Sequence, residues 1–345
     1  MANGQRASPA RWLLRIFSIL VLLALVIVLI AIAGLFVYEP APTEGFGFSS
    51  AGKTIRLSDG RTLAYLETGD PEGRPLFHFH GGPGARLEGL LFDELNQRLG
   101  IRMIVPDRPG YGLSDSQEDR TYLDWPEDVR ELADHLGIDR FAVLGWSSGG
   151  PHAAAAAHGI PERITVAAIA AGEGPYTSDD FPRKVLTGET FSGSRTNRLF
   201  IWSANNGPWL IRALSRVMRI AVFSDPVGLA ESFGDTSLSA RDRQFFKRRE
   251  YAAELVEAFR QGAEGITRDL TIERRDWPFE LENIHAPKVL VFHGEEDAGV
   301  DPRVAHYVCG RIPSCDEPTI FPGEGHSVVY YRYEEIIQGM LETWE

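Results

Sequence analysis

The sequence predicts an α/β fold, in which a mostly parallel sheet has helices on both faces and carries an inserted helical cap. Short apolar segments alternate with stretches of helical spacing, which is typical of a parallel sheet buried on both faces. Between residues 173 and 283 this alternation stops, and the chain becomes helical in pattern and rich in Arg, Trp and Phe. Because that segment lies between two predicted core strands, we expect it to cover the carboxyl edge of the sheet.

The predicted sheet begins with a hairpin over residues 54–57 and 63–66, whose turn contains Asp59-Gly60. Further strands are predicted over residues 75–80, 102–106, 140–144, 163–170, 287–293 and 319–321, and helices over 88–99 and 123–136. The core domain is therefore assigned to residues 53–172 and 284–345, and the cap to residues 173–283.

Composition is typical of a globular protein and argues against a nucleic-acid partner. Of the 345 residues, 43% are hydrophobic and 24% are charged, which is enough apolar material for a sizeable core. The formal net charge is −13, whereas a protein that binds nucleic acid needs a basic face.

The N-terminal part predicts a membrane anchor. Residues 16–38 are 23 consecutive uncharged residues, mostly Leu, Ile, Val and Ala, and a membrane span needs roughly 20. Three arginines precede this segment and two glutamates follow it: Arg6, Arg11, Arg15, Glu39 and Glu44. Because positive charge stays cytoplasmic, we expect a single-pass anchor (residues 1–40) in a lipid bilayer, with a cytoplasmic N-terminus and the folded domain outside or in a lumen. Residues 41–52 form a linker, and cleavage as a signal peptide near Ala31-Ile32-Ala33 is the alternative.

The most informative motif is the pentapeptide Gly145-Trp146-Ser147-Ser148-Gly149. It follows an apolar run and precedes a run of small residues, so the local pattern is strand, sharp turn and helix, with Ser147 at the apex. A serine hydroxyl is a poor nucleophile until it is exposed beside a base. The two glycines lack a Cβ, so the turn can close without collision.

Four further motifs occur in an order that resembles the α/β-hydrolase fold family, over about residues 53–345. They are His80-Gly81-Gly82-Pro83-Gly84, the segment from Asp107 to Ser114, Gly294-Glu295-Glu296-Asp297, and Gly323-Glu324-Gly325-His326. The resemblance implies a capped serine hydrolase whose catalytic residues follow the chain order Ser, Asp, His.

That resemblance assigns roles to five residues. Ser147 is the expected nucleophile, His326 the base and Asp297 the acid, while the amides of Gly82 and Ser148 are the expected oxyanion donors. Four carboxylates compete for the role of the acid: Glu295, Glu296, Asp297 and Asp301. The family spacing, three residues after the glycine with an apolar residue three further on, selects Asp297. Asp301, next to a proline, is predicted to cap a helix, and Glu295 and Glu296 to be solvated.

His326 is the one histidine of nine that lies in a glycine-flanked loop after the last predicted strand. His80 is expected to brace the oxyanion turn, and His293 to be buried at a strand end. Asp107, Arg108 and Ser114 are expected to brace the loops around the site.

These assignments predict a hydrolase that cleaves an acyl bond of a small-molecule substrate, most simply a carboxylic ester, without a metal or organic cofactor. Three alternatives stay open. Proline iminopeptidases share the His-Gly-Gly-Pro-Gly motif, although their turn usually has the tryptophan after the serine, and Glu173 would then bind a substrate amine or be a solvated loop residue. A non-catalytic binding protein on this fold, or an acyl transferase using the same three residues, are the others.

The two cysteines, Cys309 and Cys315, lie six residues apart around a predicted turn. In an exported domain they would form a short-loop disulfide, and otherwise they are two free thiols.

Overall fold

The computed structural model describes residues 17, 21–23, 33–34, 37–188, 190–235 and 239–344. The chain divides into two compact units, Met1–Pro40 and Ala41–Glu345, and the second holds both the sheet and the cap. Within the part of the chain that is described, none of the helices combines the length and the apolar character needed to cross a membrane. The predicted span over residues 16–38 falls mostly on residues outside that part, so it stays a prediction.

The second unit is built on an eight-stranded sheet with the order β1-β2-β4-β3-β5-β6-β7-β8. The strands are β1 Lys53–Arg56, β2 Thr62–Gly69, β3 Arg74–Phe79, β4 Ile101–Pro106, β5 Phe141–Trp146, β6 Ile164–Ala170, β7 Val289–Gly294 and β8 Thr319–Phe321. The predicted hairpin pairs β1 with β2, and β2 pairs with β4, in antiparallel fashion. All other neighbouring strands are parallel, which confirms the mostly parallel sheet.

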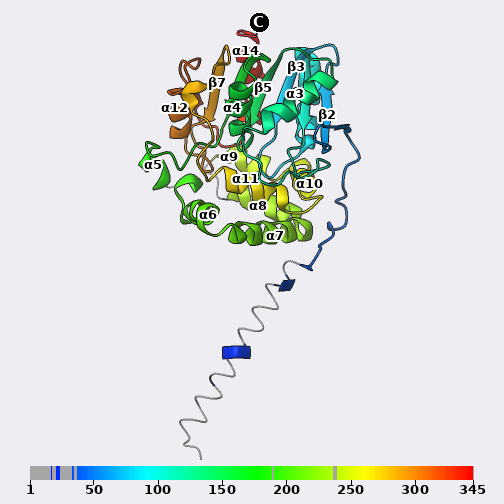
Figure 1. The fold of residues 1–345 in the computed structure, drawn as a ribbon, viewed down its shortest axis with the longest axis vertical. Coiled ribbons are helices and arrows are strands. Elements are labelled where there is room, and N and C mark those ends of the chain that lie inside the picture. The colour runs from blue at the N-terminus through cyan, green and yellow to red at the C-terminus, as the bar shows by residue number, and fades with distance from the viewer. Residues whose placement is uncertain are drawn as a thin grey trace, which may run out of the picture. The chain divides into compact units, whose positions relative to one another are not determined.

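Helices cover both faces of this sheet (Figure 1). The core helices are η1 Arg86–Phe92, α2 Asp93–Leu99, α3 Trp125–His135, α4 Gly149–Gly159, α12 Arg303–Cys309, α13 Val328–Tyr331 and α14 Tyr333–Leu341. Successive residues of β5 belong to two different hydrophobic clusters. The cluster of Val143 includes residues of α3, α4 and α12, and the cluster of Leu144 includes residues of α13 and α14. Strands buried on both sides explain the continuous apolar runs of the sequence.

One predicted helix was partly wrong. The segment expected as a single helix over residues 88–99 begins as the 3-10 helix η1, and only its second half is the α-helix α2. The Glu88 carboxylate is buried and binds the His78 ring and the Gly81 amide, whereas Leu90 is 53% exposed. Polar contacts of Glu88 therefore override the apolar spacing that predicted the helix.

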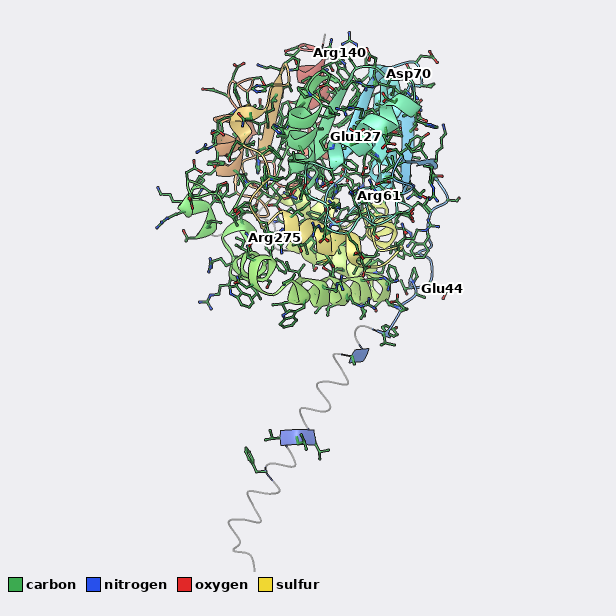
Figure 2. The ribbon with its side chains drawn as sticks, viewed as in Figure 1. Glu44, Arg61, Asp70, Glu127, Arg140 and Arg275 are labelled. Atoms are coloured by element: carbon green, nitrogen blue, oxygen red, sulfur yellow. A yellow bond between two sulfur atoms is a disulfide. The ribbon has the colours of Figure 1, made fainter. Side chains whose placement is uncertain are left out.

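The chain between β6 and β7 forms the cap, with helices over most of its length. Its elements are α5 Arg183–Leu186, η2 Phe191–Gly193, α6 Arg195–Asn206, α7 Pro208–Ser224, α8 Pro226–Asp235, α9 Ala240–Phe245, α10 Arg249–Ala258, α11 Glu264–Ile272 and η3 Leu281–Asn283. Helices α6 and α7 form the layer of the cap farthest from the sheet (Figure 1). Arg140, just before β5, and Asp70, just after β2, lie at the opposite end of the sheet (Figure 2). The carboxyl ends of the parallel strands therefore face the cap.

Cys309, the last residue of α12, is joined to Cys315 by a disulfide bond. Of the two states that the sequence left open, the structure has the bonded one.

Candidate active site

The turn between β5 and α4 is closed so tightly that it requires glycine on both sides of Ser147. A Cβ on Gly145 would lie 2.1 Å from the Gly149 carbonyl oxygen, and one on Gly149 would lie 2.0 Å from the Phe79 carbonyl oxygen. Ser147 itself has φ +53°, a left-handed conformation that is costly for a residue with a side chain. The sequence-based interpretation of this pentapeptide as a sharp turn with an apical serine agrees with this geometry.

Ser147, His326 and Asp297 form one hydrogen-bonded series, although they come from three separate loops. The Ser147 Oγ lies 2.9 Å from His326 Nε2, and His326 Nδ1 lies 2.9 Å from Asp297 Oδ2. Ser147 follows β5, Asp297 follows β7 and His326 follows β8. Parallel strands end at the same edge of a sheet, which is why residues so distant in sequence meet here.

Of the four competing carboxylates, only Asp297 contacts His326. It is buried, and its Oδ1 accepts hydrogen bonds from the Gly299 and Val300 amides at 2.8 and 2.9 Å. Burial acts to raise the pKa of Asp297, but the imidazoles of His326 and His293 hold it well below its usual range. Asp297 is therefore an anion at neutral pH, and the buried His293, 3.1 Å from its Oδ2, is its second imidazole neighbour.

Of the other three carboxylates, Glu295 and Glu296 are exposed, as expected. Asp301 was expected to cap a helix, but the N-cap of α12 is Pro302, and the Asp301 Oδ1 accepts a hydrogen bond from the Arg303 amide beside it.

His326 is electrostatically biased toward its protonated form. Burial acts to lower its pKa, but the adjacent Asp297 carboxylate, by its charge and its hydrogen bond, outweighs burial and raises the pKa to about 9. The negative charges of Asp242 and Glu173 also act to raise the pKa of His326. The ordinary imidazole pKa is roughly 6.5, so the site favours an imidazolium ion more than an isolated histidine does.

Gly82 and Ser148 line the same cavity as Ser147, and neither of their amides donates a hydrogen bond to another described residue. A Cβ on Gly82 would lie 2.4 Å from the Ser148 Oγ, so the glycine lets the loop after β3 approach the turn. Ser148 is the N-cap of α4, where the positive end of the helix dipole lies. This pair of amides is suited to bind a developing oxyanion.

Buried ionic contacts brace the loop that carries Gly82. Arg108 donates to the carbonyls of His80 and Gly81 and, at 3.0 Å, to the Ser148 Oγ. Its charge is balanced by Asp269 of α11, 2.9 Å away, which also accepts from Arg120. Arg108 is thus structural, as expected, and it links the oxyanion loop, the serine turn and the cap.

Asp107 and Ser114, also expected to brace loops, do so. Asp107 accepts from Arg86 and from the Leu113 amide, and Ser114 Oγ donates to the Asp107 carbonyl.

Asp242, on the cap helix α9, contacts the loop that carries His326, and the sequence did not predict this contact. Its carboxylate accepts hydrogen bonds from the His326 amide at 2.8 Å, from the Ser327 amide at 2.7 Å and from the Ser327 hydroxyl. A Cβ on Gly325 would lie 2.0 Å from Asp242 Oδ2, so this glycine makes room for the carboxylate. The cap therefore fixes the backbone of the loop that carries His326. Only Gly325 hinted at such a close approach in the sequence.

A cavity of about 270 Å³ adjoins Ser147. Its apolar lining includes Phe191, Phe200, Met218, Phe233, Phe246, Ile266, Leu270 and Val300. Charged residues also reach it: Glu173, half-buried after β6, and the buried pair Glu273 and Arg274 of the cap. Burial raises the pKa of Glu273 to about 8 in spite of Arg274. Among the described residues, no group of His, Cys, Asp and Glu side chains could hold a metal ion.

The chain is similar in sequence to a known protein family and to several curated proteins. The family model described as "Alpha/beta hydrolase family" matches residues 76–338. The chain is 32% identical to a proline iminopeptidase of Xanthomonas citri over 99 residues, which cover 28% of this chain and 31% of that protein. The chain spans about a third of the length of the first curated relatives that it matches.

Solved structures share the fold over most of the chain. An esterase from Rhodococcus sp. ECU1013 aligns with a TM-score of 0.60 and 21% identity, covering 86% of this chain and all of the other. A thermophilic esterase from Thermogutta terrifontis aligns with a TM-score of 0.57 and 21% identity, covering 85% of this chain and 97% of the other. At these identities the likeness shows the fold alone.

Replacing Asp242 by Asn should lower the pKa of His326, because the amide keeps the size of the carboxylate but removes its negative charge. The measurement is an NMR titration of the imidazole, with the resonance assigned by its loss in His326→Gln. The exposed Glu127→Gln on α3 is the matched control and should leave the titration unchanged. An Asp242→Asn titration identical to that of the unaltered protein would show that the cap does not influence the imidazole.

Proposed function

The chain belongs to the alpha/beta hydrolase family, and from this premise we propose that it is a serine hydrolase that cleaves carboxylic esters. Membership of the family supports a hydrolytic enzyme. The observation that carries the proposal is the hydrogen-bonded series from Ser147 through His326 to Asp297, with each step at 2.9 Å, beside a largely apolar cavity.

The geometry supports acyl transfer through a covalent intermediate. Ser147 Oγ attacks the acyl carbonyl carbon while neutral His326 accepts the hydroxyl proton, and the carbonyl oxygen takes up the negative charge. The Gly82 and Ser148 amides stabilise that oxyanion. As the tetrahedral species collapses, the imidazolium gives its proton to the leaving alcohol. Water, activated by His326 in the same way, then releases the carboxylic acid and restores Ser147.

Asp297 supports this sequence in two ways. Its carboxylate accepts a hydrogen bond from His326 Nδ1–H, which leaves Nε2 unprotonated and facing Ser147, and its charge stabilises the imidazolium that forms during attack. Because the imidazole must start neutral, the raised pKa of His326 predicts an enzyme more active at alkaline pH.

An ester with an apolar acyl or alcohol group fits the cavity best. Phenylalanine and methionine side chains from the cap, including Phe200, Met218 and Phe246, supply much of the lining. Such surfaces bind apolar groups by excluding water.

A second candidate, hydrolysis of an amide or a peptide with a free amine, is favoured by one specific observation. The carboxylates of Glu173 and Glu273 line the same cavity as Ser147. Glu173 accepts a hydrogen bond from the Tyr176 hydroxyl, whereas Glu273 is paired with Arg274 and its raised pKa favours the neutral acid. The Glu173 carboxylate is therefore the group that would bind an ammonium group of a substrate.

We also propose that residues 16–38 anchor the enzyme in a membrane, with the N-terminus cytoplasmic and the catalytic domain outside or in a lumen. The support is the uncharged length of the segment and the arginines that precede it.

Ser147→Ala should abolish covalent labelling by a fluorophosphonate, because the Ser147 Oγ is the hydroxyl hydrogen-bonded to His326 Nε2. Ser148→Ala is the control and should keep most of the labelling. Labelling that persists in Ser147→Ala would overturn the assignment of the nucleophile.

Asp297→Asn should fold normally but lose on the order of 10⁴ in kcat, by analogy with the Ser-His-Asp triad of other serine hydrolases. A fully active Asp297→Asn would overturn the role of Asp297 as the acid.

The two substrate classes are separated by comparing p-nitrophenyl esters of increasing chain length with proline p-nitroanilide. We expect higher kcat/KM for the esters, and Glu173→Gln should leave ester hydrolysis nearly unchanged. Faster anilide hydrolysis, with a KM that rises in Glu173→Gln, would instead support the amine-binding candidate.

The full-length protein should fractionate with membranes and resist extraction by high salt, because an inserted apolar helix is not held by charge. Protease added on the outer or lumenal side should digest the catalytic domain and leave residues 1–15 protected, since moving Arg11 and Arg15 across the bilayer is unfavourable. A soluble protein that begins near Gly34 would indicate cleavage, and a soluble protein with an intact N-terminus would exclude both an anchor and a signal peptide.

A further inference from the structure

We propose that the outer face of the cap docks on the surface of a phospholipid bilayer that contains anionic lipid. This cap face consists of exposed or half-buried residues of α6 and α7: Arg195, Arg198, Leu199, Trp202, Trp209, Arg212, Arg216 and Val217. Three observations support docking on the bilayer: the positive charge of the cap face, its exposed tryptophans and the route of the linker.

The cap face is basic in an acidic protein. Residues 190–224 contain five arginines and no Asp, Glu or Lys, whereas the whole chain has a net charge of −13. Four of the five belong to the cap face, and the fifth, Arg219, is buried. Arg195, Arg198 and Arg212 are exposed. An arginine cluster of this kind is complementary to anionic headgroups.

The same face exposes large apolar side chains. Trp202 is 53% exposed and Trp209 is 68% exposed, and Leu199 and Val217 are exposed beside them. The two tryptophans lie near each other, because a Cβ on Gly207 would be 3.3 Å from the Trp209 ring nitrogen and 3.6 Å from the Trp202 ring. Tryptophan is enriched where proteins meet the membrane–water interface, since its ring is apolar and its N–H is polar.

Helical spacing gathers these residues into one surface. On α6 the residues at 195, 198, 199 and 202, and on α7 those at 209, 212, 216 and 217, recur at intervals of three and four. Such intervals place side chains on the same side of a helix. These residues are exposed or half-buried, and their helices form the layer of the cap farthest from the sheet (Figure 1).

The linker contacts the cap near the C-terminal end of α7. The Thr43 amide donates to the carbonyl of Phe223 in α7 at 2.8 Å, and Arg249 of α10 lies 4.4 Å above the Phe46 ring. Glu44 lies beside the cap rather than beside the far end of the sheet (Figure 2). The predicted span ends at Tyr38, five residues before Thr43, and five residues reach at most about 18 Å. A span in the bilayer would therefore hold the end of α7 near the membrane surface.

Docking would bring the proposed active site close to lipid. Phe200 of α6 and Met218 of α7 line the cavity beside Ser147 while their helices carry the cap face. Given the proposed function, an amphiphilic ester could then reach the cavity from the bilayer. The docking itself depends only on the cap face and does not require catalysis.

The test uses the full chain reconstituted in nanodiscs and an environment-sensitive NBD label. The label is attached at Val217→Cys on the cap face and, as a control, at the exposed Glu127→Cys on α3. Discs contain either phosphatidylcholine alone or phosphatidylcholine with about 30% phosphatidylglycerol, and a nitroxide headgroup lipid serves as quencher. In the anionic discs, we expect a blue-shifted emission and about twofold or greater quenching at residue 217, but not at residue 127.

A further variant isolates the electrostatic part. Arg195→Gln with Arg212→Gln should reduce the lipid-dependent shift at residue 217, and Arg130→Gln on α3 should not. A label at 217 that stays water-exposed while the protein remains in the disc would overturn docking and leave the anchor standing. A shift that appears without lipid and grows with protein concentration would identify a second copy of the chain as the occupant, and would equally overturn the proposal.

Discussion

The close passage of the turn at residues 145–149 against the end of β3 is the constraint on which the rest of the site depends. Gly149 lies so near the Phe79 carbonyl that no side chain fits between them. This contact holds the serine turn next to the loop that begins at His80, and so places Gly82 close to Ser148. It also keeps Ser147 at φ +53°, a strained conformation that costs of order 1–3 kcal/mol and that the surrounding packing must maintain.

The cap does more than cover the cavity. Through Asp242 it holds the backbone of His326 and Ser327, and through Asp269 it balances the buried charge of Arg108 and Arg120. Removing one partner of a buried ion pair typically costs 3–5 kcal/mol, roughly, because the other charge is left without compensation. The cap and the core are therefore energetically one structure, which fits with both lying in a single compact unit.

The sequence predicted the parts of this protein whose structure is set locally. Glycines and a preceding apolar strand mark three segments in the sequence: the serine turn, the loop after β7 and the loop with His326. The order of these motifs along the chain made it possible to predict that the three segments lie together. The contacts made by Asp242 and Asp269 could not be found in this way. Each joins a cap helix to a loop 84 to 161 residues away in sequence, and neither residue lies in a local pattern.

Local pattern also misled in one place. Around Glu88 apolar spacing favoured an α-helix, yet the buried carboxylate turns inward to hold the Gly81 amide. Whether the cysteines were bonded could not be decided from their spacing either, because two residues six apart form a disulfide only if the turn between them brings their side chains together.

The pH dependence of kcat/KM for a p-nitrophenyl ester tests the central claim most directly, because it reports the ionisation of the residue that must accept the serine proton. We expect a single rise whose apparent pKa lies above roughly 6.5 and toward the value of about 9 for His326. In Asp297→Asn the residual activity should rise at lower pH, since the charge that holds the proton on the imidazole is gone. A rate that does not vary between pH 5 and 10, or an apparent pKa unaffected by Asp297→Asn, would contradict the proposed relay from Ser147 through His326 to Asp297.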